Sequence, residues 1–171
     1  MEKPLINRVA NSGLHVFNLE DHYPSQDIAD FDLKPFLFKE LILKEKDFRA
    51  ALKELDWASY KDKIVLVYNS NDAIIPVWAF MLVSAYLADH AYTVFQGTKD
   101  EYLKMHYRSL IDTLDVSQYE MERVVIKGCS KKPVPPMAYA AITAKLKPVA
   151  QSIMYGEPCS TVPIFKRPRK V

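Results

Sequence analysis

The chain has 171 residues, of which 49% are apolar, 12% aromatic and 26% charged. These proportions are typical of a globular domain and exclude collagen-like, disordered and coiled-coil chains. The formal net charge is +2, but Lys166, Arg167, Arg169 and Lys170 lie at the very end, so the rest of the chain carries a slight excess of acid. Because a nucleic-acid surface needs cations on the folded body, we expect no nucleic-acid partner.

No segment of the chain predicts export or a membrane span. The start, Met1–Pro4, lacks the apolar run of a secretory signal. The most apolar stretch, Ala73–Ala88, is interrupted by Pro76 and Ser84 and is shorter than the roughly 20 residues that cross a bilayer. We therefore expect a cytoplasmic protein with no membrane partner, and we interpret 73–88 as a buried core helix.

In the first half of the chain, hydrophobic patterning predicts two strands and two helices. Leu14–Leu19 is a short strand, and the polar segment Asp21–Asp32 is predicted to be a surface loop. An amphipathic helix starts at Asp47, which is a candidate N-cap. The β-branched run Ile64–Tyr68 is typical of a central parallel strand, and the helix that follows carries Pro76 in its first turn.

The second half continues the alternation of strands and helices. Tyr92–Phe95 is a short strand, and Thr98 and Glu101 form a capping-box pattern that opens the next helix. Arg123–Ile126 is a further strand. The spacing of the apolar residues after it predicts a final helix that runs as far as Ile153; these residues are Ala138, Ile142, Leu146, Val149 and Ile153.

This alternation indicates an α/β fold with a mostly parallel sheet, right-handed crossovers and helices on both faces. We predict a Rossmann-like three-layer sandwich, with one domain over residues 1–165 and a basic tail over residues 166–171. We find no internal repeat and no linker in the sequence. The phosphate-binding motifs GxGxxG and GxxxxGK[ST] do not occur, so we expect no bound nucleotide.

Ligands of parallel sheets bind beyond the carboxyl ends of the strands, which draws attention to the loops that follow the predicted strands. Asn69–Asp72 and Gly128–Ser130 each follow a central strand, and Gly156–Pro163 is predicted to be a loop shaped by glycine and proline. The chain's two cysteines, Cys129 and Cys159, lie in the second and third of these segments. We expect folding to bring the two sulfur atoms together at one edge of the sheet.

Two thiolates supported by carboxylates suit a soft divalent metal such as zinc or iron. The candidate ligands are Cys129, Cys159, Asp72 and Glu157. Each also has a plainer interpretation: the cysteines as small buried thiols, Asp72 as the N-cap of the helix that contains Pro76, and Glu157 as a solvated loop carboxylate. The four histidines are not candidate ligands, because their neighbours indicate core, edge or surface positions.

Two other functions stay open at this point. The first is a thiol-dependent enzyme or sulfur carrier, which requires a cysteine of lowered pKa. The second is a non-catalytic interaction domain that binds through an apolar surface, and self-association is among the partnerships we expect. Catalytic residues are not assigned.

Four segments resemble a bacterial family that is known only as a domain of unknown function. They are Leu41–Arg49, Asp72–Leu82, Lys127–Ser130 and Gly156–Pro163, and together they span nearly the whole chain. The resemblance implies no established activity. It implies a genomic association with iron–sulfur cluster assembly genes, so an accessory role in metal or iron–sulfur metabolism, with assembly proteins as partners, is the expectation it adds.

Overall fold

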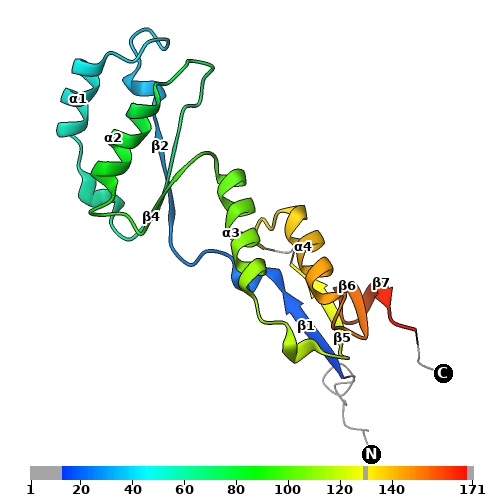
Figure 1. Cartoon of the computed structure of the whole chain (residues 1–171). Coiled ribbons are helices and arrows are strands. Elements are labelled where there is room, and N and C mark those ends of the chain that lie inside the picture. Colours follow the sequence, from blue (N-terminus) through cyan, green and yellow to red (C-terminus); the bar gives the residue numbers. More distant parts are fainter. Residues whose placement is uncertain (1–12, 129–130, 169–171) are drawn as a thin grey trace, which may run out of the picture. The chain divides into compact units, whose positions relative to one another are not determined.

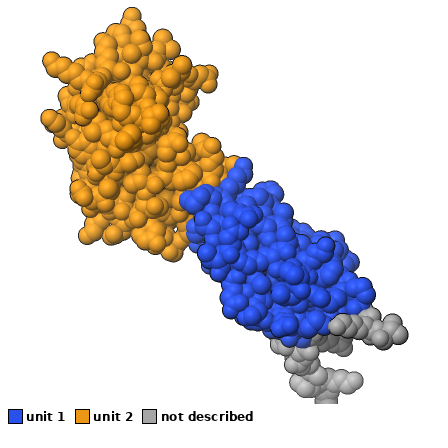
Figure 2. All heavy atoms as spheres, viewed as in Figure 1, with its two compact units in different colours: residues 1–23, 103–171 blue, residues 24–102 orange. Residues whose placement is uncertain are grey.

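A computed structural model of the chain describes residues 13–128 and 131–168. The described chain forms two compact units (Figure 2). Each unit has its own sheet. Unit 2 comprises residues 24–102, and unit 1 comprises the segments on either side of it, 1–23 and 103–171. The single domain expected over residues 1–165, with a basic tail after it, stays a prediction.

Unit 2 is a three-stranded parallel sheet with two helices. Its strands are arranged in the order β2-β3-β4. The elements in chain order are β2 (Ile28–Asp32), the short 3-10 turn Lys34–Phe36, α1 (Glu45–Lys53), the 3-10 turn Trp57–Tyr60, β3 (Ile64–Tyr68), α2 (Val77–Leu87) and β4 (Thr93–Gln96) (Figure 1).

Both helices of unit 2 pack on the same face of the sheet. Val65 and Val67, which alternate onto one face of β3, belong to the same buried cluster as Phe48 of α1 and Val83 of α2. This arrangement follows from sequential strand order, because right-handed crossovers between successive neighbouring strands place every helix on one side. The opposite face of β3 is covered as well, because Ile64 and Leu66 are fully buried.

Unit 1 has the same parallel arrangement and one additional antiparallel strand. Its sheet order is β1-β5-β6-β7, with β7 antiparallel to β6. The elements are β1 (Leu14–Asn18), the 3-10 turn Leu19–His22, α3 (Lys99–Thr113), the 3-10 turn Ser117–Tyr119, β5 (Arg123–Lys127), α4 (Pro136–Leu146), β6 (Ser152–Glu157) and β7 (Ser160–Lys166). Tyr107 of α3 and Ile142 of α4 share one buried cluster with Val124 and Ile126 of β5, so both helices again cover one face.

The two units repeat one structure. Ile64 of β3 lies opposite Thr93 of β4, and the residues 59 positions later, Arg123 of β5 and Ser152 of β6, lie opposite each other in the same way. The first strands follow the same rule at a displacement of 14 positions. Ile28 pairs with Ile64, as Leu14 pairs with Arg123.

Hydrogen bonds and backbone angles repeat at the same displacement. The amide of Ala79 donates to Pro76 O at 2.9 Å, and the amide of Ala138 donates to Pro135 O at 2.9 Å. The left-handed residues Asp62 and Met121 both have φ of 57°. Core positions correspond as well: the equivalent pairs Phe48/Tyr107, Leu52/Ile111, Ala79/Ala138, Val83/Ile142 and Leu87/Leu146 are all buried.

The expectation that nothing repeats was therefore wrong for the structure. What repeats is the backbone conformation and the pattern of buried positions. Few residues are identical between the units. Those identical between 57–97 and 116–156 are Tyr60/Tyr119, Val65/Val124, Pro76/Pro135, Ala79/Ala138, Ala85/Ala144, Leu87/Leu146, Ala91/Ala150 and Gly97/Gly156. The repeat is also nested, because the whole of unit 2 lies between the first strand of unit 1 and its remaining elements.

The structure confirms a mixed α/β fold with mostly parallel strands, and a Rossmann-like three-layer sandwich is not confirmed: among the described residues the strands form two separate sheets, and the helices in each buried cluster lie on one face. Three local predictions were wrong. The loop predicted over Asp21–Asp32 contains β2. The final helix ends at Leu146, so Ile153 belongs to β6. The loop predicted over Gly156–Pro163 consists of the end of β6, the hairpin turn and the first part of β7. No helix among the described residues is long and apolar enough to span a bilayer.

Candidate functional site

The loop after β5 and the β6–β7 hairpin leave the sheet of unit 1 at the same edge. Ile126 of β5 pairs with Tyr155 of β6, and one residue further the Lys127 ammonium lies 3.2 Å from Glu157 Oε2. Cys129 follows Lys127 by two residues, and Cys159 follows Glu157 by two. The strand pairing therefore brings the ends of β5 and β6, which precede the two cysteines in sequence, to one edge, as expected for the carboxyl ends of neighbouring parallel strands.

Gly128 allows the loop after β5 to approach the chain that follows β1. Its φ is +145°, and a Cβ placed on it would lie 2.8 Å from Leu19 Cβ. Glu20, the next residue, is a buried carboxylate whose Oε1 accepts the amide of Lys131 at 2.8 Å. Gly128 thus permits the close approach to Leu19 at the end of β5. The Glu20 carboxylate holds the backbone at Lys131 through a hydrogen bond.

Two tyrosines anchor the same region through their hydroxyl groups. Tyr107, fully buried, donates to Leu19 O at 2.9 Å, and Tyr139 donates to Gly128 O. Burial raises the pKa of Tyr107 to about 12, with smaller contributions from Tyr23 and Glu20. Tyr107 therefore remains a neutral hydrogen-bond donor throughout the physiological range, which suits a structural role.

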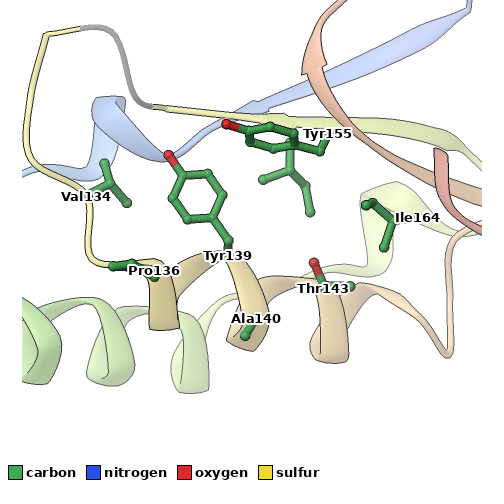
Figure 3. Close-up of a pocket in the computed structure, with 8 residues that line it drawn as sticks. Val134, Pro136, Tyr139, Ala140, Thr143, Tyr155 and Ile164 are labelled. Atoms are coloured by element: carbon green, nitrogen blue, oxygen red, sulfur yellow. The ribbon is translucent and has the colours of Figure 1, made fainter. Parts of the chain in front are cut away.

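A pocket of about 580 Å³ opens between α4 and the end of the sheet (Figure 3). It is lined by Ile126, Val134, Pro136, Tyr139, Ala140, Thr143, Tyr155 and Ile164. The rings of Tyr139 and Tyr155 lie edge to face, with centroids 5.8 Å apart and planes at 78°. Figure 3 shows Ile164 of β7 on the side of the pocket opposite Val134 and Pro136.

The chemistry of this pocket is that of a binding site. Its volume lies within the range of about 300–1,000 Å³ that small-molecule sites occupy. None of the lining residues that the structure describes carries a formal charge, and the polar groups among them are the hydroxyls of Thr143, Tyr139 and Tyr155. Such a lining favours contact with the apolar surface of a ligand. It offers no carboxylate, imidazole or amine for proton transfer.

The predicted metal ligands are found in different settings. Cys129 lies outside the described residues. Cys159 is exposed at the hairpin turn, and Glu157 pairs with Lys127. Asp72 belongs to unit 2, where its equivalent in unit 1 is Lys131; it does not cap α2, whose N-cap is Pro76. Within 13–128 and 131–168, no group of three or more His, Cys, Asp or Glu is placed to hold a metal ion.

The loop Asn69–Asp72 follows β3 in unit 2, as the segment after Lys127 follows β5 in unit 1. The two polar loops therefore follow the middle strands of two different sheets. Asn69 holds its loop closed, because its Nδ2 donates to Asn71 Oδ1 at 2.7 Å and to Ala73 O at 3.1 Å. Asp47 is a second predicted cap that fails: α1 begins at Glu45 and has Lys44 as its N-cap.

Sequence reasoning missed the residues that line the pocket. Tyr139 was hidden inside an apolar helical pattern, and Tyr155 lay in a segment with no predicted strand. A usable signal was present for Tyr139, because Pro135 and Pro136, which precede it closely in sequence, mark the start of α4.

Comparisons with known proteins address the family and not the pocket. No curated protein and no solved structure matches this chain. A family model described as "protein of unknown function (DUF2480)" matches residues 3–167. The match covers nearly the whole chain, including both units and the nested connection between them, and so the chain belongs to the DUF2480 family.

Proposed function

We propose that unit 1 is a binding module for an uncharged, largely apolar molecule that occupies the pocket between α4 and the β6–β7 hairpin. The observation that carries the proposal is the lining itself: apolar side chains and two tyrosine rings at the carboxyl end of parallel strands, with no formal charge. Burial of apolar ligand surface supplies about 25 cal/mol for each Å², and a charged ligand would lose its hydration without gaining an ion pair.

The shape of the pocket favours a flat ring as part of the ligand. Tyr139 and Tyr155 present an edge and a face at right angles, and a third ring continues such an arrangement with favourable edge-to-face contacts. Thr143, on α4 one turn after Tyr139, supplies a hydroxyl that hydrogen-bonds a polar substituent. The proposed ligand class is therefore an uncharged aromatic or alicyclic molecule with one polar group.

A neutral tricyclic fluorophore, 1-aminoanthracene, tests the proposal by titration. We expect the probe to bind the full chain with a rise in fluorescence, and Ala140→Trp, which fills the pocket, to weaken binding by about tenfold or more. Ala144→Trp is the matched control, because Ala144 lies on the same helix, is exposed and does not line the pocket. Equal affinity in the wild type and in Ala140→Trp contradicts the proposal, as does the absence of binding.

A second candidate is the metal or thiol site that the sequence predicts, and one observation favours it. The contact between Lys127 and Glu157 brings the segments that precede Cys129 and Cys159 to the same edge of unit 1. We propose zinc or iron as the metal, with Cys129 and Cys159 as thiolate ligands and Glu157 as a candidate supporting ligand; Asp72 belongs to unit 2 and is not part of this proposal. An accessory role in metal or iron–sulfur metabolism, or thiol and sulfur-carrier chemistry, would follow from such a site.

Elemental analysis of the purified protein separates this candidate from the pocket. Stoichiometric metal that is lost in the double variant Cys129→Ser, Cys159→Ser supports it. Metal content that is substoichiometric and unchanged by the double variant contradicts a metal site. Thiol alkylation across pH tests the other chemistry, since a reactive thiolate requires a pKa below the free value of about 8.5.

A further inference from the structure

The repeat shows what unit 2 lacks. In unit 1, the third parallel strand, β6, is followed by β7, which pairs with its outer edge and places Ile164 over α4. In unit 2, the equivalent strand β4 is paired only with β3 among the described strands. The sheet of unit 2 therefore ends at the position where the sheet of unit 1 continues.

The outer edge of β4 carries backbone groups that are free to pair. The Gly97 amide donates to Val67 O, toward β3, and backbone groups alternate in direction along a strand. The amides and carbonyls of Val94 and Gln96 therefore point away from β3. Their equivalents in unit 1, Ile153 and Tyr155, lie opposite β7 residues.

Among the edge strands described, β2 and β7 carry features that prevent pairing with another chain: β2 contains Asp30 and Asp32, and β7 contains both Pro163 and Lys166. In β1, His15 lies 3.4 Å from the Glu122 carboxylate. β4 has the sequence Thr-Val-Phe-Gln, with no charge and no proline. Natural edge strands carry charges or proline to block edge-to-edge association, so an unguarded edge indicates one that is covered in the assembled protein.

The helix beside this edge is also apolar on its outer side. α2 contains no charged residue, and Val77 and Met81 are 74% and 67% exposed. Their equivalents in unit 1, Pro136 and Ala140, line the pocket that Ile164 of β7 closes. Val77 and Met81 thus lie on the side of α2 where an added strand would cover them.

We propose that this edge is an interface between two copies of the chain, in which β4 pairs with β4 of the second copy in antiparallel orientation. A two-fold axis makes equivalent edge strands antiparallel, which is the orientation that β7 adopts on β6. The lack of charge favours this occupant, because residues near a two-fold axis meet their own copies, where a charge would meet a like charge. The proposal is independent of the ligand pocket in unit 1.

The alternation of backbone groups limits the register, and we expect the one that pairs both outward-pointing residues of β4. Val94 and Gln96 point outward, so Val94 of one copy pairs with Gln96 of the other, and Phe95 lies opposite Phe95 at the two-fold axis. Four hydrogen bonds join the strands in this register. The two sheets of unit 2 then form one six-stranded sheet, with Val77 and Met81 of each copy facing the added strands.

The oligomeric state of the full chain, measured by sedimentation across micromolar concentrations, tests the interface. We expect a dimer. Met81→Glu is expected to weaken association by about a hundredfold or more, because each dimer then buries two unpaired carboxylates. Leu41→Glu is the matched control: Leu41 is also 67% exposed in unit 2 but lies in the turn between Phe38 and Ile42, away from β4. We expect it to leave association unchanged.

A crosslinking experiment tests the register. In a Cys129→Ser, Cys159→Ser background, Phe95→Cys places two thiols opposite each other, and an added oxidant removes two electrons and two protons to join them. Tyr92→Cys is the control, because in this register Tyr92 is offset by several residues from its copy. We expect a disulfide-linked dimer from the first variant and none from the second.

Three results overturn the proposal. The first is a monomeric wild type at every concentration, and the second is a dimer that Met81→Glu leaves intact. The third is a dimer that Met81→Glu disrupts but that Phe95→Cys does not crosslink, which points to an α2 interface without strand pairing. Circular dichroism of each variant confirms folding, and Met81→Glu, at an exposed position, decides the result if the Phe95 variant is unfolded.

Discussion

Unit 1 continues past its third parallel strand into β7, whereas unit 2 stops at β4. Where the strand is present, it closes a pocket over α4 that contains two tyrosines. Where it is absent, the equivalent helix presents Val77 and Met81 to solvent. One scaffold therefore supports two kinds of surface, and the difference depends on seven residues of additional strand, Ser160–Lys166.

The buried core positions of the two units differ much less than their edge strands. Phe17 and Phe31 occupy equivalent buried positions on the first strands, and Leu19 and Leu33 follow them, also buried. The comparison teaches that the repeat conserves volume and burial in the core and varies side chains at the periphery, which is where binding differences arise.

The largest expected effect comes from the matched core positions Leu87 and Leu146, both fully buried. Replacement of either by alanine leaves a cavity in the layer between helix and sheet, and we expect a loss of about 3 kcal/mol in the free energy of unfolding. Urea titration combined with amide hydrogen exchange at β3 and β5 measures each loss. A loss below about 1 kcal/mol at one site would show that the two cores are not packed equivalently.

A smaller effect is expected at Tyr107, whose equivalent in unit 2 is Phe48. Tyr107→Phe leaves Leu19 O without the donor it has at 2.9 Å, and we expect a loss of about 1–2 kcal/mol in unfolding free energy at neutral pH. The variant makes the unit 1 core resemble that of unit 2 at this position.

The pH dependence sharpens this test. Burial raises the pKa of Tyr107 from 10.0 to about 12, so the folded state retains the proton when the unfolded state has lost it. The stability of the wild type is therefore constant below about pH 10 on this account and falls as the pH rises toward 12. The difference between wild type and Tyr107→Phe should shrink over that interval, and a constant difference contradicts the role assigned to the hydroxyl.

The smallest effect is expected at Asp32, whose equivalent in unit 1 is Asn18. Burial raises the pKa of Asp32, but hydrogen bonds from Ser70 and the Lys34 amide outweigh it and hold the pKa below its usual value. Asp32→Asn keeps an acceptor and removes the charge, so we expect a loss under about 1 kcal/mol at neutral pH.

The sign of the pH dependence identifies the charge as the cause. A lowered pKa adds stability above the unfolded value near 3.8, and this stability is lost as pH falls through the folded value. Wild type and Asp32→Asn should therefore converge in acid, as followed by urea titration at several pH values. A difference that persists unchanged in acid would assign the effect to geometry.

Sequence patterns predicted the elements whose signals are local and strong. β3 and β5 are continuous β-branched runs. The capping box at the start of α3 is also confirmed, because the Thr98 amide donates to Glu101 Oε2 at 2.7 Å and the Glu101 amide donates to Thr98 Oγ1 at 3.4 Å. Such features depend on a few neighbouring residues, so they are visible without knowledge of the fold.

The edge strands and the repeat were not predictable in the same way. β2 has two aspartates and β7 has a proline. These residues suit exposed edge strands, but they are rare in strands generally, so sequence patterns do not predict a strand there. The repeat is hidden because equivalent core residues, such as Phe48 and Tyr107, share burial and not identity. The pocket depends on contacts between α4 and β7 that only the folded chain brings together, so no local pattern predicted that Tyr139 and Tyr155 line it.

The nesting of the repeat determines the order in which the chain becomes able to fold as it is synthesised. Within unit 2, Ile28 of β2 pairs with Ile64. In unit 1, Leu14 of β1 pairs with Arg123, so this pairing is possible only after a much longer stretch of chain has been synthesised. The longer loop adds about 1 kcal/mol of closure entropy, and contacts of greater separation form more slowly. β1 is synthesised before the other described strands and is thus among the last of them to be paired, after the intervening sheet has had time to assemble.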